Sequence, residues 1–309
     1  MTPAELNQLR EGLPGFSPGA IAFPLLEKYQ QFYQLDFSSN YPEASYRCGM
    51  ITSGDFRLFS QRWLLPQARA TLLLVHGYFD HAGIYDKLIE YGLSRNCNVL
   101  IFDLPGHGLS SGERALIESF ADYGQAVADV LAQAELPALP IFAVGQSTGC
   151  SALIEMARHN SWPIQKLALL APLVRPAGWL GVRLGHLLLH RFTDSLERKF
   201  NRNTSDLGFL DFLRGDPLQC HRMSLLWIGA LKRWLKSLPL EDLGVGPALV
   251  IQGSKDGTVG WPYNMKVVPK LFPGADIHYL EDAGHQLANE SRPIREEYFA
   301  ILDGYFFGA

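Results

Sequence analysis

The sequence predicts an α/β fold in which a mostly parallel sheet carries helices on both faces and a helical segment is inserted between two later strands. Three observations predict this fold. Short apolar runs alternate with stretches of helical periodicity along most of the chain. One apolar run ends at a serine between two glycines, which is typical of a tight strand-to-helix turn. The alternation is interrupted once, from residue 172 to residue 246, by a stretch of helical character without a clear strand.

The composition is that of an ordinary globular protein. With 309 residues, of which 47% are hydrophobic and 19% charged, the chain has enough apolar content for one large domain or for a domain with an insertion. Its net charge of −4 and its pI of about 6.1 give no reason to expect a nucleic acid as a partner. Four widely spaced cysteines, of which Cys150 lies just after the serine turn, are expected to be reduced thiols, with Cys150 used for packing.

The N-terminus shows no charged region followed by an apolar core, and no apolar run approaches the roughly 18 residues of a membrane-spanning helix. We therefore expect a cytoplasmic protein. Peripheral contact with the inner face of the membrane is compatible with this expectation.

The predicted elements divide the chain into four parts. Residues 1–45 form an N-terminal extension with one helix near 25–35. The first part of the core, 46–171, is predicted to contain a hairpin of strands 47–52 and 56–65, strands 70–75, 98–102, 141–144 and 166–170, and helices 84–94, 119–134 and 149–159. Residues 172–246 form the helical insertion. The second part of the core, 247–309, is predicted to contain strands 248–252 and 276–280 and helices 261–271 and 291–302.

The serine turn has the sequence Gly145-Gln146-Ser147-Thr148-Gly149, which fits the G-x-S-x-G nucleophile elbow. A short pattern of this kind is weak alone, but here an apolar strand precedes it and a helix follows it. Glycine is required on both sides because a Cβ atom would collide with neighbouring backbone in so sharp a turn. Ser147 is the predicted nucleophile, and the geometry suits acyl transfer.

A serine hydroxyl needs a histidine to accept its proton and a carboxylate to orient that histidine. In sheets with this elbow the acid and then the histidine follow the serine along the chain. Asp256 follows the strand at 248–252, and His285 follows the next strand, so we predict these two as the partners. Asp282 is the rival acid, although it shares the loop of His285 and would have difficulty reaching the far ring nitrogen. Asp103 precedes the serine and is not favoured.

Two backbone amides are predicted to form an oxyanion hole. Thr148 supplies the amide after the nucleophile, and Tyr78 supplies a second amide from the loop after strand 70–75, where Gly77 lets the backbone bend toward the site. We expect His76 and His107 to hold their loops by hydrogen bonds rather than to take part in catalysis.

With these residues identified, the chain resembles an α/β-hydrolase of the monoacylglycerol lipase and lysophospholipase group over about residues 45–309. The resemblance rests on Val75-His76-Gly77-Tyr78, on Phe102-Asp103-Leu104-Pro105-Gly106-His107-Gly108-Leu109-Ser110-Ser111-Gly112, on the elbow, and on Gly253-Ser254-Lys255-Asp256 with Ala283-Gly284-His285.

This resemblance implies a Ser-Asp-His triad, to which Ser147, Asp256 and His285 correspond, and a cap formed by 172–246. The elbow carries Gln146 and Thr148 beside Ser147 where relatives often carry His and Met, which changes the side chain of the amide donor but not the amide.

The insertion is apolar and basic. Half of the six tryptophans lie in it, and its 11 Lys and Arg against 7 Asp and Glu give +4, which leaves −8 for the rest of the chain. Two apolar clusters in the insertion allow two interpretations. They pack the insertion onto the core, or they form an apolar pocket or a membrane-facing surface. The clusters are Trp179, Leu180, Val182 and Leu187–Leu189, and Leu225–Ile228, Leu231, Trp234 and Leu235.

The positive charge indicates an anionic partner near the insertion, such as a lipid phosphate or an anionic bilayer. A solvated helix face formed by Lys232, Arg233 and Lys236 is the alternative.

These observations predict a serine esterase that hydrolyses the single acyl chain of a lysophospholipid or monoacylglycerol through an acyl-enzyme and needs no metal or organic cofactor. A proline-type aminopeptidase shares the fold, but a basic insertion counts against its need for carboxylates that bind a free amino group. A non-catalytic lipid-binding or scaffold protein is the third alternative, although such a protein would usually have lost a member of the triad.

Overall fold

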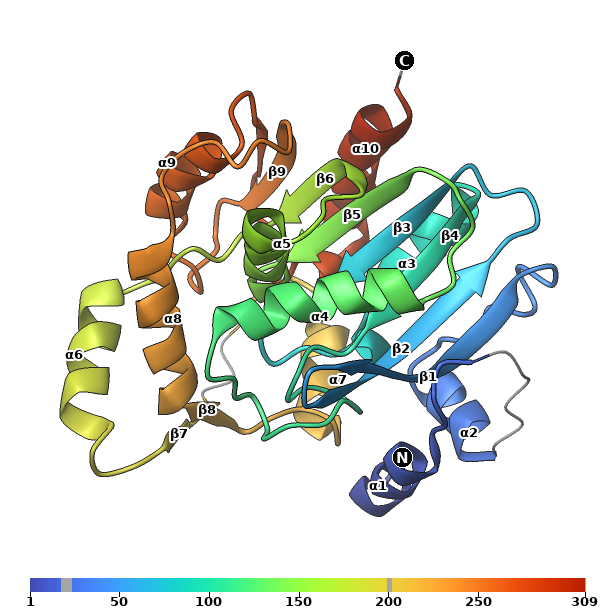
Figure 1. Ribbon diagram of the computed structural model, residues 1–309, viewed down its shortest axis with the longest axis horizontal. Coiled ribbons are helices and arrows are strands. Elements are labelled where there is room, and N and C mark those ends of the chain that lie inside the picture. The colour runs from blue at the N-terminus through green and yellow to red at the C-terminus, as the bar shows by residue number, and fades with distance from the viewer. Residues whose placement is uncertain (18–23, 199–201, 309) are drawn as a thin grey trace.

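The computed structural model describes residues 1–17, 24–198 and 202–308 (Figure 1). A sheet of eight strands lies at the centre of these residues, in the spatial order β1-β2-β4-β3-β5-β6-β9-β10. Strand β2 pairs antiparallel with β1 and β4, and the other ladders are parallel, so the predicted hairpin and the mostly parallel sheet are confirmed. The strands are β1 (Ser45–Ser53), β2 (Phe56–Leu64), β3 (Ala70–Val75), β4 (Cys97–Phe102), β5 (Ile141–Gln146), β6 (Ile164–Leu170), β9 (Ala248–Gly253) and β10 (Asp276–Leu280).

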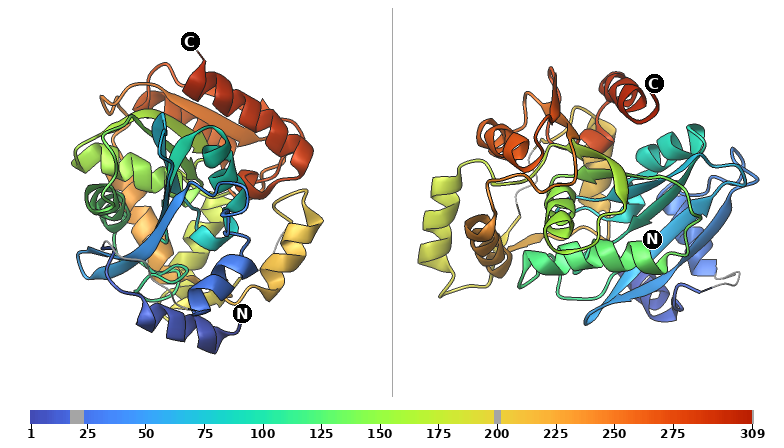
Figure 2. Two further views of the ribbon diagram at one scale, coloured as in Figure 1. Left: turned by 90° about the vertical axis from the view of Figure 1, so that its right-hand side faces the viewer. Right: turned by 45° about the horizontal axis from the view of Figure 1, so that its top comes forward.

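Helices cover both faces of the sheet, as Figure 2 shows from two further directions. Helices α3 (Asp86–Ser94) and α10 (Arg292–Phe307) cover one face, and α4 (Phe120–Gln133), α5 (Thr148–His159) and α9 (Trp261–Leu271) cover the other. Two 3₁₀ turns, Ala82–Ile84 and Leu287–Asn289, lie in the connecting loops.

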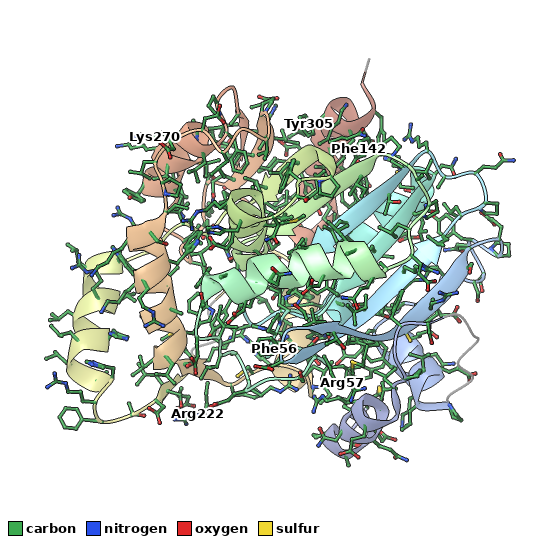
Figure 3. All side chains as sticks on the ribbon, in the orientation of Figure 1. Phe56, Arg57, Phe142, Arg222, Lys270 and Tyr305 are labelled. Atoms are coloured by element: carbon green, nitrogen blue, oxygen red, sulfur yellow. The ribbon has the colours of Figure 1, made fainter. Side chains whose placement is uncertain are left out.

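Each face of the sheet has its own hydrophobic core because side chains alternate along a strand. In β3, Leu72 and Leu74 belong to the core beneath α3 and α10, whereas Leu73 and Val75 belong to the core beneath α4 and α5. Phe142 of β5, labelled in Figure 3, stacks on Phe306 of α10 in the first of these layers, with the ring centroids 5.2 Å apart. Strands buried on both faces explain the continuous apolar runs of the sequence.

The described part of the N-terminal extension, residues 1–17 and 24–45, contains two helices, whereas the sequence predicted one. Helix α2 (Pro24–Phe32) is the predicted helix, and α1 (Pro3–Gly12) was missed. The signal for α1 was present, because Thr2 and Glu5 form a capping box around a proline in the first turn. Leu6 and Leu9 of α1 are buried against the core, so the extension packs onto the domain.

The segment between β6 and β9 contains α6 (Trp179–Leu189), α7 (Leu207–Gly215) and α8 (Leu225–Ser237). The prediction that it has no strand is wrong. Strands β7 (Ser195–Glu197) and β8 (Arg222–Ser224) form a small antiparallel pair. A strand of three residues is too short to show alternation in a sequence, which is why neither was predicted.

The two apolar clusters of this segment differ in burial. Trp227, Ile228, Leu231 and Trp234 of α8 are buried in the core beneath α4, so the packing interpretation holds for them. Helix α6 lies outside α8 at the edge of the molecule (Figure 1) and has no fully buried residue. Trp179 and Val182 at its start pack against the core, whereas Leu180, Leu184, Leu187 and Leu188 are exposed.

Candidate active site

The candidate nucleophile lies in a strained turn between β5 and α5. Ser147 has φ 54° and ψ −112°, a backbone conformation that residues other than glycine rarely adopt. A Cβ atom on Gly149 would lie 2.0 Å from the carbonyl oxygen of Val75, and one on Gly145 would lie 2.9 Å from the amide nitrogen of Cys150. The two glycines are thus required by close backbone packing, as the elbow pattern predicts.

The structure brings Ser147, His285 and Asp256 together at the edge of the sheet where the parallel strands end. His285 Nε2 lies 2.9 Å from Ser147 Oγ, and His285 Nδ1 lies 2.8 Å from Asp256 Oδ2. All three residues are buried, with exposed fractions of 6% each. This chain of contacts is the arrangement in which an imidazole takes a proton from a serine hydroxyl.

Further hydrogen bonds orient the carboxylate of Asp256. Oδ1 accepts from the amides of Thr258 and Val259, and Oδ2 accepts from Gln252 Nε2. Burial raises the pKa of Asp256, but the neighbouring His285 and these donors outweigh it, and the pKa lies below its ordinary value. An ionised Asp256 accepts from Nδ1–H of His285, which leaves Nε2 free to accept from the serine.

The rival acids have other partners. Asp282 is exposed and pairs with Lys255 at 2.5 Å, although it lies only three residues from His285. The buried carboxylate of Asp103 accepts from the amides of Ala82 and Leu109. Neither aspartate is hydrogen-bonded to His285, so the geometry favours Asp256.

His76 and His107 hold the loops around the site, as expected. The amide of Leu104 donates to His76 Nε2, so Nδ1 carries the hydrogen and donates to the carbonyl oxygen of Gly77 at 2.8 Å. Burial lowers the pKa of His76 well below its ordinary value and that of His107 to about 4. Both rings are therefore neutral near pH 7 and act through hydrogen bonds.

The loop with Gly77 and Tyr78 lies directly against Ser147. A Cβ atom on Gly77 would lie 3.3 Å from Ser147 Cβ and 3.0 Å from Asp80 Oδ2. The Tyr78 hydroxyl donates to the carbonyl oxygen of Ala115 at 2.7 Å, and its ring stacks on Trp227 at 4.0 Å. The side chain of Tyr78 is thus held by Ala115 and Trp227, and neither contact involves Ser147.

A cavity of about 270 Å³ opens at Ser147 and His285. Its walls include Tyr78 and Thr148, the two predicted amide donors. The insertion supplies much of the remaining wall, with apolar side chains and three arginines. These are Val182, Leu210, Leu213, Met223, Trp227 and Ile228, and Arg198, Arg202 and Arg214.

Sequence reasoning missed one buried acid in this cavity. Asp80 accepts from Gln286 Nε2 at 2.9 Å and from the Tyr85 hydroxyl at 3.1 Å, and its burial raises its pKa. No motif points to Asp80, because one of its partners, Gln286, lies 206 positions away along the chain. The arginines of the wall were visible only as the positive balance of the insertion.

The four cysteines are unpaired thiols in the structure. Cys150 is fully buried and donates to the carbonyl oxygen of Gly145, and burial raises its pKa. It packs the elbow helix, as predicted.

The sheet order, the elbow and the serine at the edge of the sheet define this protein as an α/β-hydrolase. The chain belongs to the family described as serine aminopeptidase, S33 (Hydrolase_4), whose model matches residues 66–292. It is a hydrolase of the group that includes monoglyceride lipases and phospholipases.

Named relatives lie at low identity. The chain is 28% identical to phospholipase YtpA of Bacillus subtilis over 79% of this chain and 98% of the relative. It is 29% identical to the monoglyceride lipase of Rattus norvegicus over 64% of this chain and 69% of the relative.

Among solved structures, the fold is similar to the monoacylglycerol lipase of Paleococcus ferrophilus, with a TM-score of 0.67 at 22% identity over 82% of this chain and 99% of that one. It is also similar to a soluble variant of Saccharomyces cerevisiae monoglyceride lipase in complex with a substrate analog. The TM-score is 0.70 at 18% identity, and the match covers 85% of this chain and 93% of that one.

Proposed function

We propose that this protein is a serine ester hydrolase that acts on single-chain acyl lipids, a lysophospholipid or a monoacylglycerol, through an acyl-enzyme intermediate. The observation that carries the proposal is the hydrogen-bonded chain Ser147–His285–Asp256 at the mouth of a largely apolar cavity. The names of the relatives, phospholipase and monoglyceride lipase, support the same substrate class.

In this proposal Ser147 Oγ attacks the ester carbonyl carbon while His285 Nε2 takes the hydroxyl proton. Asp256 holds the ring and stabilises the imidazolium that forms. The negative charge on the carbonyl oxygen is stabilised by the amides of Tyr78 and Thr148. Collapse of the tetrahedral intermediate breaks the ester bond, and His285 returns its proton to the leaving alcohol. Water, activated by His285, then cleaves the acyl-serine and releases the fatty acid.

The insertion, residues 172–246, acts as a cap in this proposal, because its apolar side chains line the cavity beside Ser147. An acyl chain is suited to the side formed by Leu210, Leu213 and Ile228. The three arginines favour a phosphate-bearing head group over a neutral glycerol.

Peripheral contact with an anionic membrane is the second part of the proposal. On α6, Leu180, Leu184, Leu187 and Leu188 are between 57% and 79% exposed, and Phe192 just beyond the helix is 86% exposed. Residues 173–193 contain no acidic residue and include Arg183 and Arg191. A basic helix with an exposed row of leucines suits the interface of an anionic bilayer. No helix within the described residues has the length and apolarity to cross a bilayer.

The membrane proposal is tested by co-sedimentation with anionic vesicles. Leu184 and Leu207 are 57% and 58% exposed, so Leu207→Ser on α7 is a matched control for Leu184→Ser combined with Leu188→Ser. We expect the α6 double variant to bind at least about tenfold more weakly, because burial of a leucine contributes about 1.5–3 kcal/mol. Turnover of a short soluble ester should not change. Equal vesicle binding by all three proteins would contradict the proposal.

The basic face of α8 has partners of its own. Lys232 Nζ lies 3.1 Å from His186 Nδ1 of α6, and Arg233 donates to the carbonyl oxygen of Glu118. Neutralising Lys232, Arg233 and Lys236 together is still expected to raise KM for anionic vesicles, and added salt should imitate the change. If neither treatment affects vesicle binding, this face is only a solvated helix surface.

An aminopeptidase activity is the second candidate, because the family description names one. Such an enzyme binds the free amino group of its substrate through carboxylates. The cavity has Asp80, but Gln286 and Tyr85 already donate to it, and the arginines of the wall disfavour a cationic substrate. A non-catalytic lipid-binding protein is the third alternative.

One set of assays separates the three. Wild type and Ser147→Ala are compared on p-nitrophenyl esters of increasing chain length, lysophospholipids, monoacylglycerols and aminoacyl amides. The proposal expects Ser147-dependent turnover of the acyl lipids. Turnover of amides alone would favour the aminopeptidase, and lipid binding without turnover of any substrate would favour the binding protein.

A further inference from the structure

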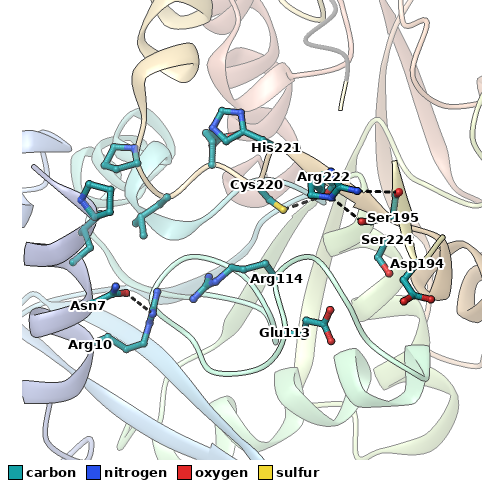
Figure 4. A pocket seen from close by; sticks show the side chains of 15 residues that line it. Asn7, Arg10, Glu113, Arg114, Asp194, Ser195, Cys220, His221, Arg222 and Ser224 are labelled. Atoms are coloured by element: carbon teal, nitrogen blue, oxygen red, sulfur yellow. Dashed lines mark hydrogen bonds between the residues drawn. The ribbon is translucent and has the colours of Figure 1, made fainter. Parts of the chain in front are cut away.

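A second and larger cavity lies away from Ser147, between α1, the loop at residues 113–114 and the part of the insertion around β7 and β8 (Figure 4). Its volume is about 520 Å³, and it shares no lining residue with the cavity at Ser147. A volume in this range accommodates a small organic ligand. Nothing in the proposed reaction uses this site.

Two arginines converge on one carbonyl oxygen at the wall of this cavity. Arg10 Nη2 donates to the oxygen of Gly108 at 3.2 Å, and Arg114 Nη1 donates to the same oxygen at 2.7 Å. Arg10 Nε also donates to the oxygen of Leu109, and Arg114 Nη2 donates to the oxygen of Ser110. Two guanidinium groups are therefore held side by side by backbone carbonyls, and Figure 4 shows them pointing toward each other.

The two positive charges repel each other, and the carboxylates nearby offset this repulsion only in part. Burial lowers the pKa of Arg10 and of Arg114, and the charge of Arg10 adds to the effect on Arg114. The carboxylate of Asp103 attracts both, but it is fully buried and accepts from two backbone amides. Among the described residues, neither arginine has a carboxylate oxygen within salt-bridge distance.

A third arginine lines the same cavity from β8. Arg222 donates to the hydroxyl and the carbonyl oxygen of Ser195 on β7, and it too has no ion pair within the described part of the chain. Two acids also line the cavity, Glu113 and Asp194. In the view of Figure 4 their carboxylates lie on the other side of Arg114 from Arg10. The cavity thus has a cationic end at α1, whereas Glu113, Asp194 and Arg222 lie together at the end near β7.

We propose that this cavity binds a small phosphate monoester, whose phosphate contacts Arg10 and Arg114. Guanidinium groups match the geometry of phosphate oxygens and bind them through several charge-assisted hydrogen bonds. The carboxylates of Glu113 and Asp194 at the other end then receive a hydroxyl group of the same ligand. A bound ligand would join α1 to the insertion, whose Ser224 lines this cavity and caps α8. The site is independent of the proposed esterase activity.

The test is calorimetric titration of the full chain with glycerol 3-phosphate. We expect saturable binding by wild type, with a Kd between about 10 µM and 1 mM, and a Kd at least about tenfold higher for Arg10→Gln and for Arg114→Gln. Arg69→Gln is the matched control, because Arg69 also donates to a backbone carbonyl and lies outside this cavity. Circular dichroism checks that each variant is folded. If Arg10→Gln and Arg114→Gln fail to fold, Arg222→Gln replaces them and should also raise the Kd, because Arg222 lines the same cavity. Its side chain is exposed, and within the described residues its hydrogen bonds go to Ser195.

A second arm identifies the source of the phosphate group. Vesicles that contain phosphatidic acid are sedimented with the same proteins. Binding that is lost in the same arginine variants supports the site and assigns it to a lipid head group, whereas calorimetric binding alone assigns it to a soluble ester. The proposal is overturned if wild type binds neither probe, or if the variants bind as tightly as wild type and Arg69→Gln.

Discussion

Replacing Asp256 by asparagine tests how the triad is held. The amides of Thr258 and Val259 both donate to Oδ1, so the new side chain must place its carbonyl oxygen there. Its NH₂ group then occupies the position of Oδ2, where it faces His285 Nδ1 and the donor Gln252 Nε2. Nδ1 must become an acceptor, and the ring hydrogen moves to Nε2. A histidine in that tautomer presents a hydrogen to Ser147 and does not accept one.

The structure therefore predicts a large loss of turnover with little change of shape. For this kind of substitution kcat falls by about 10⁴-fold, which corresponds to about 5.5 kcal/mol in the activation free energy. KM should change little, because Asp256 does not line the cavity. The assay is hydrolysis of a short p-nitrophenyl ester under steady-state conditions.

Asp282→Asn is the matched control. It removes a carboxylate three residues from His285, but that carboxylate is exposed and pairs with Lys255. An exposed pair of this kind contributes at most about 1 kcal/mol to stability, and we expect kcat to stay within a factor of about two. If Asp282→Asn is the more damaging change, or if Asp256→Asn keeps kcat within about tenfold of wild type, the assignment of the acid is wrong.

Three further predictions follow from the same contacts. Ser147→Ala should lower kcat by about 10⁴ to 10⁶ in the ester assay while the thermal unfolding curve is retained, and residual activity within about tenfold would remove it as the nucleophile. Gly77→Val should lower kcat by about 10² to 10³ because its side chain would crowd Ser147, whereas Tyr78→Phe should be mild; a severe effect of Tyr78→Phe alone would contradict the role of the amide. The buried pair His81–Asp216 should make stability depend on pH. Burial lowers the pKa of His81, but the neighbouring Asp216 raises it by more, so the pKa of His81 lies above its ordinary value. Burial raises the pKa of Asp216, but His81 lowers it by more, so the pKa of Asp216 lies below its ordinary value. The stabilisation is thus complete between about pH 4 and 6.5, is lost at higher pH through His81 and is lost at lower pH through Asp216. Urea unfolding of wild type and Asp216→Asn across pH should show the largest difference in that window, and a constant difference would refute the linkage.

Much of the fold was predictable because its signals are local. The strands of the sheet are buried on both faces and read as short apolar runs, and Ser119 and the elbow marked the starts of two helices. The same locality explains the missed elements. Strands β7 and β8 have three residues each, and they form only because they pair with each other.

The candidate site was predictable from chain order. Ser147, Asp256 and His285 each follow a strand of a parallel sheet, and such strands end at one edge, so the three residues meet although 138 positions separate the first from the last. Their catalytic roles stay predictions. The choice between Asp256 and Asp282 needed the structure, because it depends on which carboxylate faces His285 Nδ1.

The sequence by itself determined the strand order along the chain, the elbow and the residues able to carry acyl transfer, because these depend on periodicity, turn geometry and side-chain chemistry. Only the tertiary structure decided which apolar side chains are covered. The leucines of α6 and α8 look alike in the sequence, but Leu231 of α8 is buried whereas Leu184 and Leu187 of α6 are exposed. It also decided that Arg10 and Arg114, which are 104 positions apart, share the carbonyl oxygen of Gly108. Burial and the meeting of distant charges depend on how elements pack, and that packing is a property of the whole chain.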